Sequence, residues 1–234
     1  MLLTKNGLAE SRERAQALIL AGKVRVGGET VRRPDRAVSE DAPLAVDSEP
    51  SYASRGALKL GPALDSFGVD AAGRLCADIG ASTGGFTDVL LRRGAARVYA
   101  LDVGRGLLHW RLRQDPRVVV IERTNARDLE SFPEAVDLVV VDVSFISLEK
   151  VLPAIRRSAP GAEVVALFKP QFEVGRADVG KGGIVRNPAA VEAALARFRA
   201  WCAGNGYRVA GEARSEVAGA EGNREIFVHL EPGS

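Results

Sequence analysis

The sequence has few of the features that mark secreted, disulfide-bonded or membrane-spanning proteins. Only two of its 234 residues are cysteines, and Cys76 and Cys202 form no C-x-x-C pair. Their apolar neighbours predict two buried thiols rather than a disulfide or a metal site. The most hydrophobic stretch, VDLVVVDV at 136–143, is interrupted by acids, so no run approaches the roughly 18 apolar residues of a membrane span. The chain also lacks the apolar core of a signal peptide, which predicts a cytoplasmic protein.

Positively and negatively charged side chains are nearly equal in number. The net charge is +2, aromatic residues make up 6%, and the mean hydropathy is -0.01, as in soluble globular proteins. Net charge alone therefore does not indicate a nucleic-acid partner. Its distribution is uneven, because residues 1–36 contain eight lysines or arginines against four acids. This local excess points to a small basic unit at the N-terminus.

Within this unit the pattern predicts a helix followed by a hairpin. Ser11 can cap a helix that Gly22 ends. Its apolar positions fall at Ala15, Leu18 and Ile19. The segment KVRVGGETV at 23–31 then predicts two strands around Gly27 and Gly28, a pair that tolerates positive φ.

The basic side chains of this unit suit contact with a phosphate backbone. Arg12 and Gln16 lie one turn apart on the expected helix. The cations that can surround them are Arg14, Lys23, Arg25, Arg32 and Arg33. Such residues position phosphates without reading bases, although a solvated charged face explains the same charge pattern.

SRERAQALILAGKVRVGGETVRRP resembles the small RNA-binding domain first seen in a small-subunit ribosomal protein and shared by pseudouridine synthases. That resemblance favours RNA. It also implies a helix pair before the hairpin, of which the first helix is shortened here.

The rest of the chain alternates helical stretches with short runs rich in valine and isoleucine. Near-continuous apolar strands separated by helices indicate a parallel sheet buried on both faces. YRVAGEARSEV and REIFVHL close the chain as an antiparallel pair. We therefore expect an α/β, Rossmann-like sheet, mostly parallel with an antiparallel last strand, behind a small N-terminal α+β domain. The expected boundaries are 1–46 for the RNA-binding domain, 47–55 for the linker and 56–234 for the catalytic domain.

The stretch ADIGASTGGFTDVLLRRG at 77–94 sets a glycine-rich turn between a strand and a helix. It reads D-x-G-x-S-x-G-G from Asp78, rather than the G-x-G-x-x-G that brings backbone amides against a pyrophosphate. A carboxylate there repels a pyrophosphate but pairs with an ammonium or lies near a sulfonium. S-adenosylmethionine carries both cations and is the expected cofactor. Its expected contacts in the turn are Asp78, Gly80, Ser82, Gly84, Gly85 and Phe86.

Acids and amides at later strand ends extend this expected cofactor site. Asp102 ends the second strand, 22 residues after Gly80, where an acid accepts both ribose hydroxyls. Asn125, or Asp128, follows the third strand and can meet the adenine edge. A dehydrogenase would explain the glycines and Asp102, but not the acid at position 78.

Four charged residues stand where strands and helices meet the same expected edge of the sheet: Lys59, Asp142, Lys169 and Glu225. Singly, each is most simply a solvent-facing residue. Together they match methylation of a ribose 2′-hydroxyl, a poor nucleophile that needs a base. A lysine serves as that base only if its ammonium form is destabilised, and a second lysine nearby with partial burial has this effect. We expect Lys169 to be the base beside Lys59, with Asp142 and Glu225 orienting the two lysines.

Motifs throughout the chain are similar to the TlyA family of ribosomal RNA methyltransferases, whose catalytic half is of the FtsJ type. The motifs are SRGALKL, ADIGASTGGFTDVLLRRGAARVYALDVG, LHWRLRQDPRV, ERTNARDL, DVSFISL, LFKPQFEVGR, GKGGIVRNP and GNREIF. The resemblance implies 2′-O-methylation of ribosomal RNA, usually at cytidine. It also implies that the family's Lys-Asp-Lys-Glu tetrad falls on Lys59, Asp142, Lys169 and Glu225, and that Asp142 touches the cofactor.

Further residues are expected to touch RNA. After the fourth strand stands Asp142-Val143-Ser144-Phe145 instead of the Asn/Asp-Pro-Pro-aromatic motif of amine methylation. Phe145 can stack on a splayed base, although its sequence context favours a buried ring. The stretch 169–188 is expected to be a mobile substrate loop, anchored by Phe172. Arg176, Lys181 and Arg186 would reach the RNA backbone from it, with Arg55 as a further contact.

Several readings stay open at this point. His109 and Trp110 can flank the cofactor, but a hydrogen-bonded histidine and a core tryptophan are the simpler expectation. No metal is expected. The family's other name, haemolysin, raises a membrane-active protein as an alternative, and a catalytically silent RNA-binding protein is another. The absence of a spanning segment and of a basic amphipathic helix with a broad apolar face argues against direct lysis.

Overall fold

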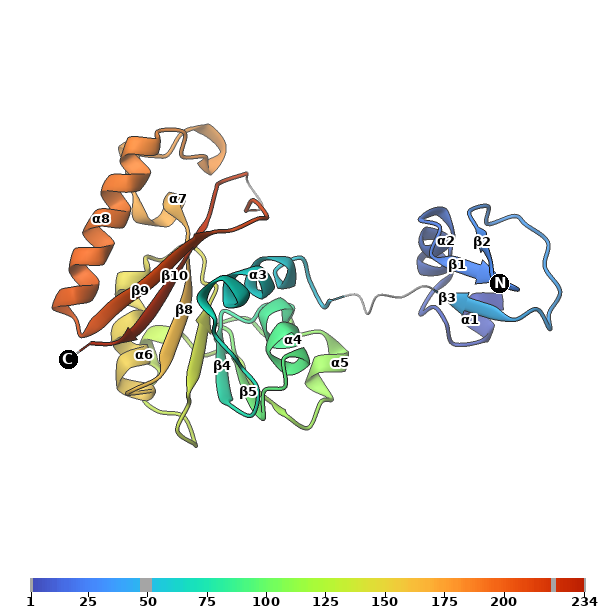
Figure 1. Ribbon diagram of the computed structural model, residues 1–234, viewed down its shortest axis with the longest axis horizontal. Helices are drawn as coiled ribbons and strands as arrows, with labels where there is room; N and C mark the ends of the chain where they lie inside the picture. Colours follow the sequence, from blue (N-terminus) through green and yellow to red (C-terminus); the bar gives the residue numbers. More distant parts are fainter. Residues whose placement is uncertain (1, 47–51, 220–221, 234) are drawn as a thin grey trace. The chain divides into compact units, whose positions relative to one another are not determined.

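The computed structural model describes residues 2–46, 52–219 and 222–233, and it divides into two compact units, residues 1–51 and 52–234 (Figure 1). Part of the expected linker, residues 47–51, lies outside the described residues. The boundaries 1–46, 47–55 and 56–234 therefore stay a prediction.

The N-terminal unit packs two helices on a three-stranded antiparallel sheet. Helix α1 spans Leu2–Lys5 and α2 spans Arg12–Leu20. The strands β1 (Val24–Val26), β2 (Glu29–Val31) and β3 (Leu44–Val46) lie in the order β2-β1-β3. The predicted cap is confirmed, since Arg14 N donates to Ser11 Oγ at 3.1 Å. The buried core consists of Leu3, Ala15, Leu18, Ile19, Val24 and Val31.

The predicted hairpin is confirmed as well. Gly27 and Gly28 connect β1 to β2 with φ of 58° and 88°, the left-handed region that glycine tolerates. Strand β3 was not predicted; it has only three residues and pairs with the edge of β1 opposite β2. Strand β3 reaches β1 because the chain returns through the loop after β2, and the sequence of that loop shows no strand pattern.

The C-terminal unit contains a seven-stranded sheet in the order β6-β5-β4-β7-β8-β10-β9. Its strands are β4 (Leu75–Ile79), β5 (Arg97–Leu101), β6 (Val118–Ile121), β7 (Leu138–Val141), β8 (Glu163–Phe168), β9 (Tyr207–Arg214) and β10 (Ile226–Pro232). The pairs among β4 to β8 are parallel, whereas β10 runs antiparallel to both β8 and β9. The predicted sheet with an antiparallel last strand is therefore confirmed.

Helices cover both faces of this sheet (Figure 1). They are α3 (Ala57–Phe67), α4 (Gly85–Arg92), α5 (Trp110–Arg113), α6 (Leu152–Ser158), α7 (Pro170–Glu173) and α8 (Pro188–Gly204). Short 3₁₀ turns are η1 (Ala126–Asp128), η2 (Leu148–Lys150), η3 (Arg176–Asp178) and η4 (Lys181–Gly183). Alternate strand residues enter two separate cores: Ala77 and Ile79 face α6 and α8, whereas Cys76 faces α3 and α4. Burial on both faces explains why the strands read as continuous apolar runs.

Both cysteines are buried, as the sequence predicted, and burial raises the pKa of the Cys76 and Cys202 thiols to about 12. The prediction of a core tryptophan at position 110 is wrong. Trp110 begins α5 and is 58% exposed, with the His109 ring stacked against it. A four-residue helix has too little buried face to cover an indole, and Leu112 takes the buried position instead. His109 is hydrogen-bonded as expected, because its Nδ1 accepts from Arg111 N at 3.3 Å.

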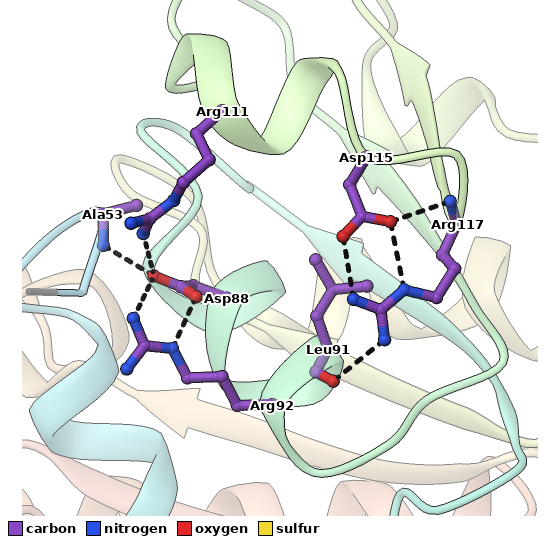
Figure 2. Close-up of polar contacts among 7 residues, drawn as sticks. All are labelled: Ala53, Asp88, Leu91, Arg92, Arg111, Asp115 and Arg117. Atoms are coloured by element: carbon purple, nitrogen blue, oxygen red, sulfur yellow. Dashed lines mark hydrogen bonds and ion pairs between the residues drawn. The ribbon is translucent and has the colours of Figure 1, made fainter. Parts of the chain in front are cut away.

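The beginning of the C-terminal unit is fastened to α4 by one buried carboxylate (Figure 2). Asp88 accepts hydrogen bonds from Ala53 N at 2.8 Å, from Arg92 Nε at 2.8 Å and from Arg111 at 3.1 Å. The Arg92 guanidinium also lies over the Tyr52 ring, 4.2 Å from its centroid. These contacts fix residues 52–53 against α4, immediately before the segment that enters the candidate site.

Candidate active site

The turn between β4 and α4 needs glycine because other backbone approaches it closely. Gly80 has φ of 84°, and a Cβ there would lie 2.5 Å from the carbonyl oxygen of Asp142. Gly84 has φ of 95°, and a Cβ on Gly85 would lie 2.9 Å from Ala57 N. Ser82 also has positive φ, at 48°. The turn therefore lies close against the end of β7, the start of α3 and the side chains of Leu108 and Leu112, which leave no room for a Cβ at these glycines.

Asp78 stands at the end of β4 as a fully buried carboxylate with one oxygen unpaired. Its Oδ2 accepts from Thr87 N at 2.8 Å and from Thr87 Oγ1 at 2.6 Å, whereas its Oδ1 has no hydrogen-bond partner. Burial raises the pKa of Asp78 to about 7, with the hydrogen bonds from Thr87 lowering it and the nearby carboxylates of Asp142 and Asp102 contributing to the rise. A buried acceptor without a partner is costly, so this oxygen is suited to a cationic ligand. Sequence reasoning missed Thr87, which holds the other oxygen.

Asp102 lies just beyond β5 and orders the neighbouring loops. Its Oδ2 accepts from Ser82 N at 2.8 Å and its Oδ1 accepts from Gly104 N at 2.7 Å. Asn125 caps η1, where its Oδ1 accepts from Arg127 N at 3.1 Å. Both carboxylate oxygens of Asp102 retain lone pairs for hydroxyl donors, because each accepts a single bond from the protein.

Two adjoining cavities lie over the carboxyl ends of the parallel strands. The first has a volume of about 250 Å³ and is lined by residues that include Ser54, Lys59, Asp78, Phe86 and Asp142. The second, of about 460 Å³, is lined by residues that include Asp102, Asn125, Asp142 and Phe145. Gly80, Ser82 and Asp142 line both cavities. Together the cavities form one two-part hollow at the point where the strand order reverses. The predicted cofactor residues line it, except Gly84, which lies against Leu108 and Leu112 instead.

The chemistry of this hollow fits S-adenosylmethionine. Asp78 lines the first cavity, and its unpaired Oδ1 can accept from an ammonium group. Asp102 and Asn125 line the second cavity, where they can meet a ribose and an adenine edge. The acid at one end and the mixed polar and apolar lining at the other match the two ends of that molecule.

The four predicted catalytic residues form two ion pairs. Lys59 Nζ lies 2.7 Å from Glu225 Oε2, and Lys169 Nζ lies 2.6 Å from Asp142 Oδ1. The side chains of Lys59, Glu225 and Lys169 are 12%, 3% and 10% exposed. Lys59 and Asp142 both line the first cavity, so one member of each pair faces the same space.

The surroundings of Lys169 include a contact that the sequence did not predict. Lys169 Nζ donates to Ser144 Oγ at 2.9 Å, so a hydroxyl as well as a carboxylate positions the ammonium. The Asp142 contact is an ion pair without hydrogen-bond alignment. Each lysine therefore has its own acid, and the pairs join the end of β7 to that of β8 and α3 to the start of β10.

The expectation that Phe145 is buried is wrong. Its ring is 88% exposed and packs on Phe172 with the ring centroids 5.2 Å apart. Its φ of 63° lies in the left-handed region, which is unfavourable for a bulky residue. Phe145 follows the carboxyl end of β7, where Phe172 of α7 covers only a small part of its ring. The exposed ring therefore lies at the mouth of the second cavity, which it helps to line.

The other predicted RNA contacts are all exposed in their own units. On α2 and around β1 these are Arg12, Arg14, Gln16, Lys23 and Arg25. Arg55 is exposed at the rim of the first cavity, and Lys181 and Arg186 are exposed between α7 and α8. The stretch 169–188, expected to be a loop, contains α7, η3 and η4, with Phe172 half-buried.

One group of potential metal ligands lies elsewhere on the sheet. Glu163, His229 and Glu231 bring their ligand atoms within 4.8 Å of one another. Glu163 is already paired with Arg74 at 2.6 Å and with His229 at 2.6 Å, and Glu231 pairs with Arg208. Glu163 begins β8 whereas Lys169 follows its end, so the group belongs to the opposite edge of the sheet. It is explained as an ion-pair network.

Comparison with known families matches both units. The family of FtsJ-like methyltransferases matches residues 52–231, and the S4 domain matches residues 1–43. Among residues 2–46, 52–219 and 222–233, no helix has both the length and the apolar character needed to cross a membrane.

Individual relatives cover nearly the whole chain. The 16S/23S rRNA (cytidine-2′-O)-methyltransferase TlyA of Mycobacterium tuberculosis is 51% identical over 97% of this chain and 87% of its own length. The putative rRNA methyltransferase YqxC of Bacillus subtilis is 45% identical over 98% of this chain and 84% of its own length. A solved structure, a putative hemolysin from Streptococcus thermophilus, covers 100% of this chain and 87% of its own, with 42% identity and a TM-score of 0.76.

Proposed function

Because the chain belongs to the TlyA family, in which an S4 domain precedes an FtsJ-like methyltransferase domain, we propose that it methylates the ribose 2′-hydroxyl of a nucleotide in ribosomal RNA. The methyl donor is S-adenosylmethionine, and the target nucleoside is cytidine. The observation that carries this proposal is the unpaired oxygen of buried Asp78 in the same cavity as Lys59 and Asp142. Ribosomal subunits are the partners, and the cytoplasm is where the chain meets them.

The cofactor would lie along the two-part hollow. Asp78 Oδ1 would accept from the ammonium group, and Asp102 would accept from the ribose hydroxyls. Asn125 would meet the adenine edge. The backbone from Gly80 to Gly85 and the Phe86 ring would form the wall, and Asp142 would lie between the two cavities. When bound, the cofactor supplies an electrophilic methyl group on a cationic sulfur.

The lysine pairs would prepare the 2′-hydroxyl for attack. Lys169 would accept the hydroxyl proton, which requires that it first release its own. Asp142 and Ser144 would orient the Lys169 amine, and Glu225 would hold Lys59 against the sugar. Base catalysis of this kind contributes about 10²–10⁴ in rate, and alignment of the reacting atoms adds to it.

RNA would be held by both units. In the proposed boundaries, residues 1–46 bind phosphates through Arg12, Arg14, Gln16, Lys23 and Arg25, residues 47–55 connect, and residues 56–234 carry the chemistry. Arg55, Lys181 and Arg186 would contact the backbone near the target nucleotide. Phe145 would stack on the splayed base, since its ring is exposed at the cavity mouth. Some relatives in this same methyltransferase family are named hemolysins, so that name does not favour a membrane-active protein.

The substrate is tested by product analysis. The purified chain is incubated with methyl-labelled S-adenosylmethionine and separated small or large ribosomal subunits, and the RNA is digested to nucleosides. The proposal expects label in 2′-O-methylcytidine. Label in a base would overturn the proposal in favour of base methylation. RNA that binds to the chain without receiving a methyl group would overturn it in favour of a catalytically silent RNA-binding protein.

A further inference from the structure

The segment between α7 and α8 has little structure of its own to hold it in place. Residues 174–187 form two 3₁₀ turns, η3 and η4, and carry the exposed cations Arg176, Lys181 and Arg186. Gly182 and Gly183 both have φ of 76°, so the backbone turns sharply in η4. Most of its described hydrogen bonds are local, as in Gly180 N to Ile184 O at 3.0 Å. Something outside the segment must fix it if its cations are to meet RNA in one place.

A single buried amide provides that contact. Asn223 Oδ1 accepts from Val185 N at 2.9 Å, and Asn223 Nδ2 donates to Gly183 O at 2.8 Å. Asn223 is 2% exposed, so water does not compete for these bonds while the side chain is in place. The amide therefore pairs with the segment through both of its polar ends. Of the hydrogen bonds described for residues 176–186, these two connect the segment with another part of the chain.

Asn223 belongs to the connection between β9 and β10, which leads directly into the catalytic pairs. Two residues later, Glu225 holds Lys59 at 2.7 Å. The backbone of the connection is tied to itself, because Gly219 N donates to Asn223 O at 2.9 Å. A Cβ on Gly219 would lie 2.6 Å from Glu225 Oε1, so the connection passes directly against that carboxylate.

Its neighbour Ala218 lines the first cavity, so the connection also forms part of the wall around the proposed methyl donor. Figure 1 shows the described parts of the β9–β10 connection, residues 215–219 and 222–225, at the same end of the sheet as the α7–α8 connection. The Asn223 side chain therefore bonds to the basic segment two residues before the carboxylate that holds Lys59.

We propose that Asn223 is a positioning residue that couples RNA contact on residues 181–186 to the Lys59–Glu225 pair. The proposal rests on the proposed function, because it assigns Lys181 and Arg186 to RNA. When RNA fixes these cations, the two bonds of Asn223 hold the β9–β10 connection, and with it Glu225, in the arrangement needed for catalysis. Without Asn223, the segment still carries its charges, but its position is no longer linked to the tetrad.

The test is a double-mutant cycle on methyl transfer to the ribosomal subunit that the chain modifies. The variants are Asn223→Ala, Arg186→Ala and their combination. Asn223→Ala is expected to lower kcat/KM for RNA at least tenfold while the Kd for S-adenosylhomocysteine changes less than threefold. Arg186→Ala is expected to lower kcat/KM several-fold in the wild-type background and less than twofold when Asn223 is already replaced. Independent, multiplicative effects of the two substitutions would overturn the coupling.

Two further variants separate positioning from folding. Asn223→Asp has the same shape and keeps an acceptor for Val185 N, but it turns an oxygen toward Gly183 O, so it should show the same loss without a cavity. Ser215→Ala removes the hydrogen bond from Ser215 Oγ to Val217 O at 2.7 Å in the same connection, does not touch residues 181–186, and should retain activity. Equal losses of activity in Ser215→Ala and Asn223→Asp would mean that any disturbance of the connection lowers activity, and this would overturn the specific role of Asn223.

Amide hydrogen exchange distinguishes this proposal from the function on which it rests. The Val185 amide should exchange at least tenfold faster in Asn223→Ala than in the wild type, whether or not RNA is methylated. If the wild type transfers no methyl group to RNA, the proposed function fails. If the wild type is active and both Asn223 variants match it, only the coupling fails.

Discussion

The unpaired oxygen of Asp78 predicts that binding and stability respond to pH in opposite directions. In the cofactor-free chain, burial raises the pKa of Asp78 from an ordinary 3.8 to about 7. Between these values the folded chain holds a proton that the unfolded chain has released, so the free energy of unfolding falls as pH rises from about 4 to about 7. At about 1.4 kcal/mol per pH unit, the loss amounts to about 4 kcal/mol.

Cofactor binding should show the reverse dependence, because the ammonium group pairs with the ionised carboxylate. Isothermal titration with S-adenosylhomocysteine should give a Kd that rises as pH is lowered from 7.5 to 5.5, with a limiting slope of about tenfold per pH unit. Asp78→Asn should flatten this profile and raise the Kd at pH 7.5 by about 10- to 100-fold, as expected for a lost charge-assisted bond. The same variant, without cofactor, should be more stable than the wild type at pH 8 by about 1–3 kcal/mol in urea unfolding.

The exposed Asp41→Asn is the matched control for this experiment and should change neither quantity. A Kd that stays constant from pH 5.5 to 7.5 in the wild type would refute the reasoning. So would an Asp78→Asn variant that binds as tightly as the wild type.

Three other substitutions test separate parts of the site. Phe145→Ala should lower kcat/KM for RNA by about 5- to 150-fold, the range for loss of one base stack, with cofactor affinity unchanged; activity equal to that of the wild type would mean that the ring does not stack on the target. Gly80→Ala places a Cβ 2.5 Å from Asp142 O at φ of 84°. Calorimetric titration should therefore show no cofactor binding, and thermal unfolding should show a lower Tm. Normal cofactor binding would show that the turn adapts to the added methyl group. Asp88→Ala removes the acceptor that Arg92, Arg111 and Ala53 N share and should destabilise the C-terminal unit by about 1–3 kcal/mol in urea unfolding, because both guanidinium groups reach solvent. A loss below about 0.5 kcal/mol would show that the anchor is dispensable.

Much of the fold could be predicted because its strands and helix ends are indicated by residues close together in the sequence. The valine-rich runs at β6, β7 and β8 and the Asn187-Pro188 start of α8 need no distant partner to be recognised. The three-residue strand β3 could not be recognised in this way, because its pairing comes from the return of a long loop. The exposure of Phe145 and Trp110 also escaped prediction, since it depends on which parts of the surface the helices leave uncovered.

The candidate site was predictable in its residue types and less so in its contacts. Strand order brings the ends of β7 and β8 together, so the meeting of Asp142 and Lys169 follows from the topology. The pairing of Lys59 with Glu225, 166 positions apart, follows from how α3 lies on the sheet. Thr87, Ser144 and Asn223 lie within the quoted motifs, but the sequence assigns them no role, because a hydroxyl or an amide becomes important only through the groups that tertiary packing places against it.

The central claim is that Lys169 takes the proton from a ribose hydroxyl beside the methyl donor. Single-turnover methyl transfer to ribosomal subunits measures this directly in the wild type, in Lys169→Ala and in Lys150→Ala, an exposed lysine on η2. Lys169→Ala should lose about 10²–10⁴ in rate while its affinity for S-adenosylhomocysteine stays within threefold. Lys150→Ala should match the wild type. Transfer by Lys169→Ala at the wild-type rate would contradict the account.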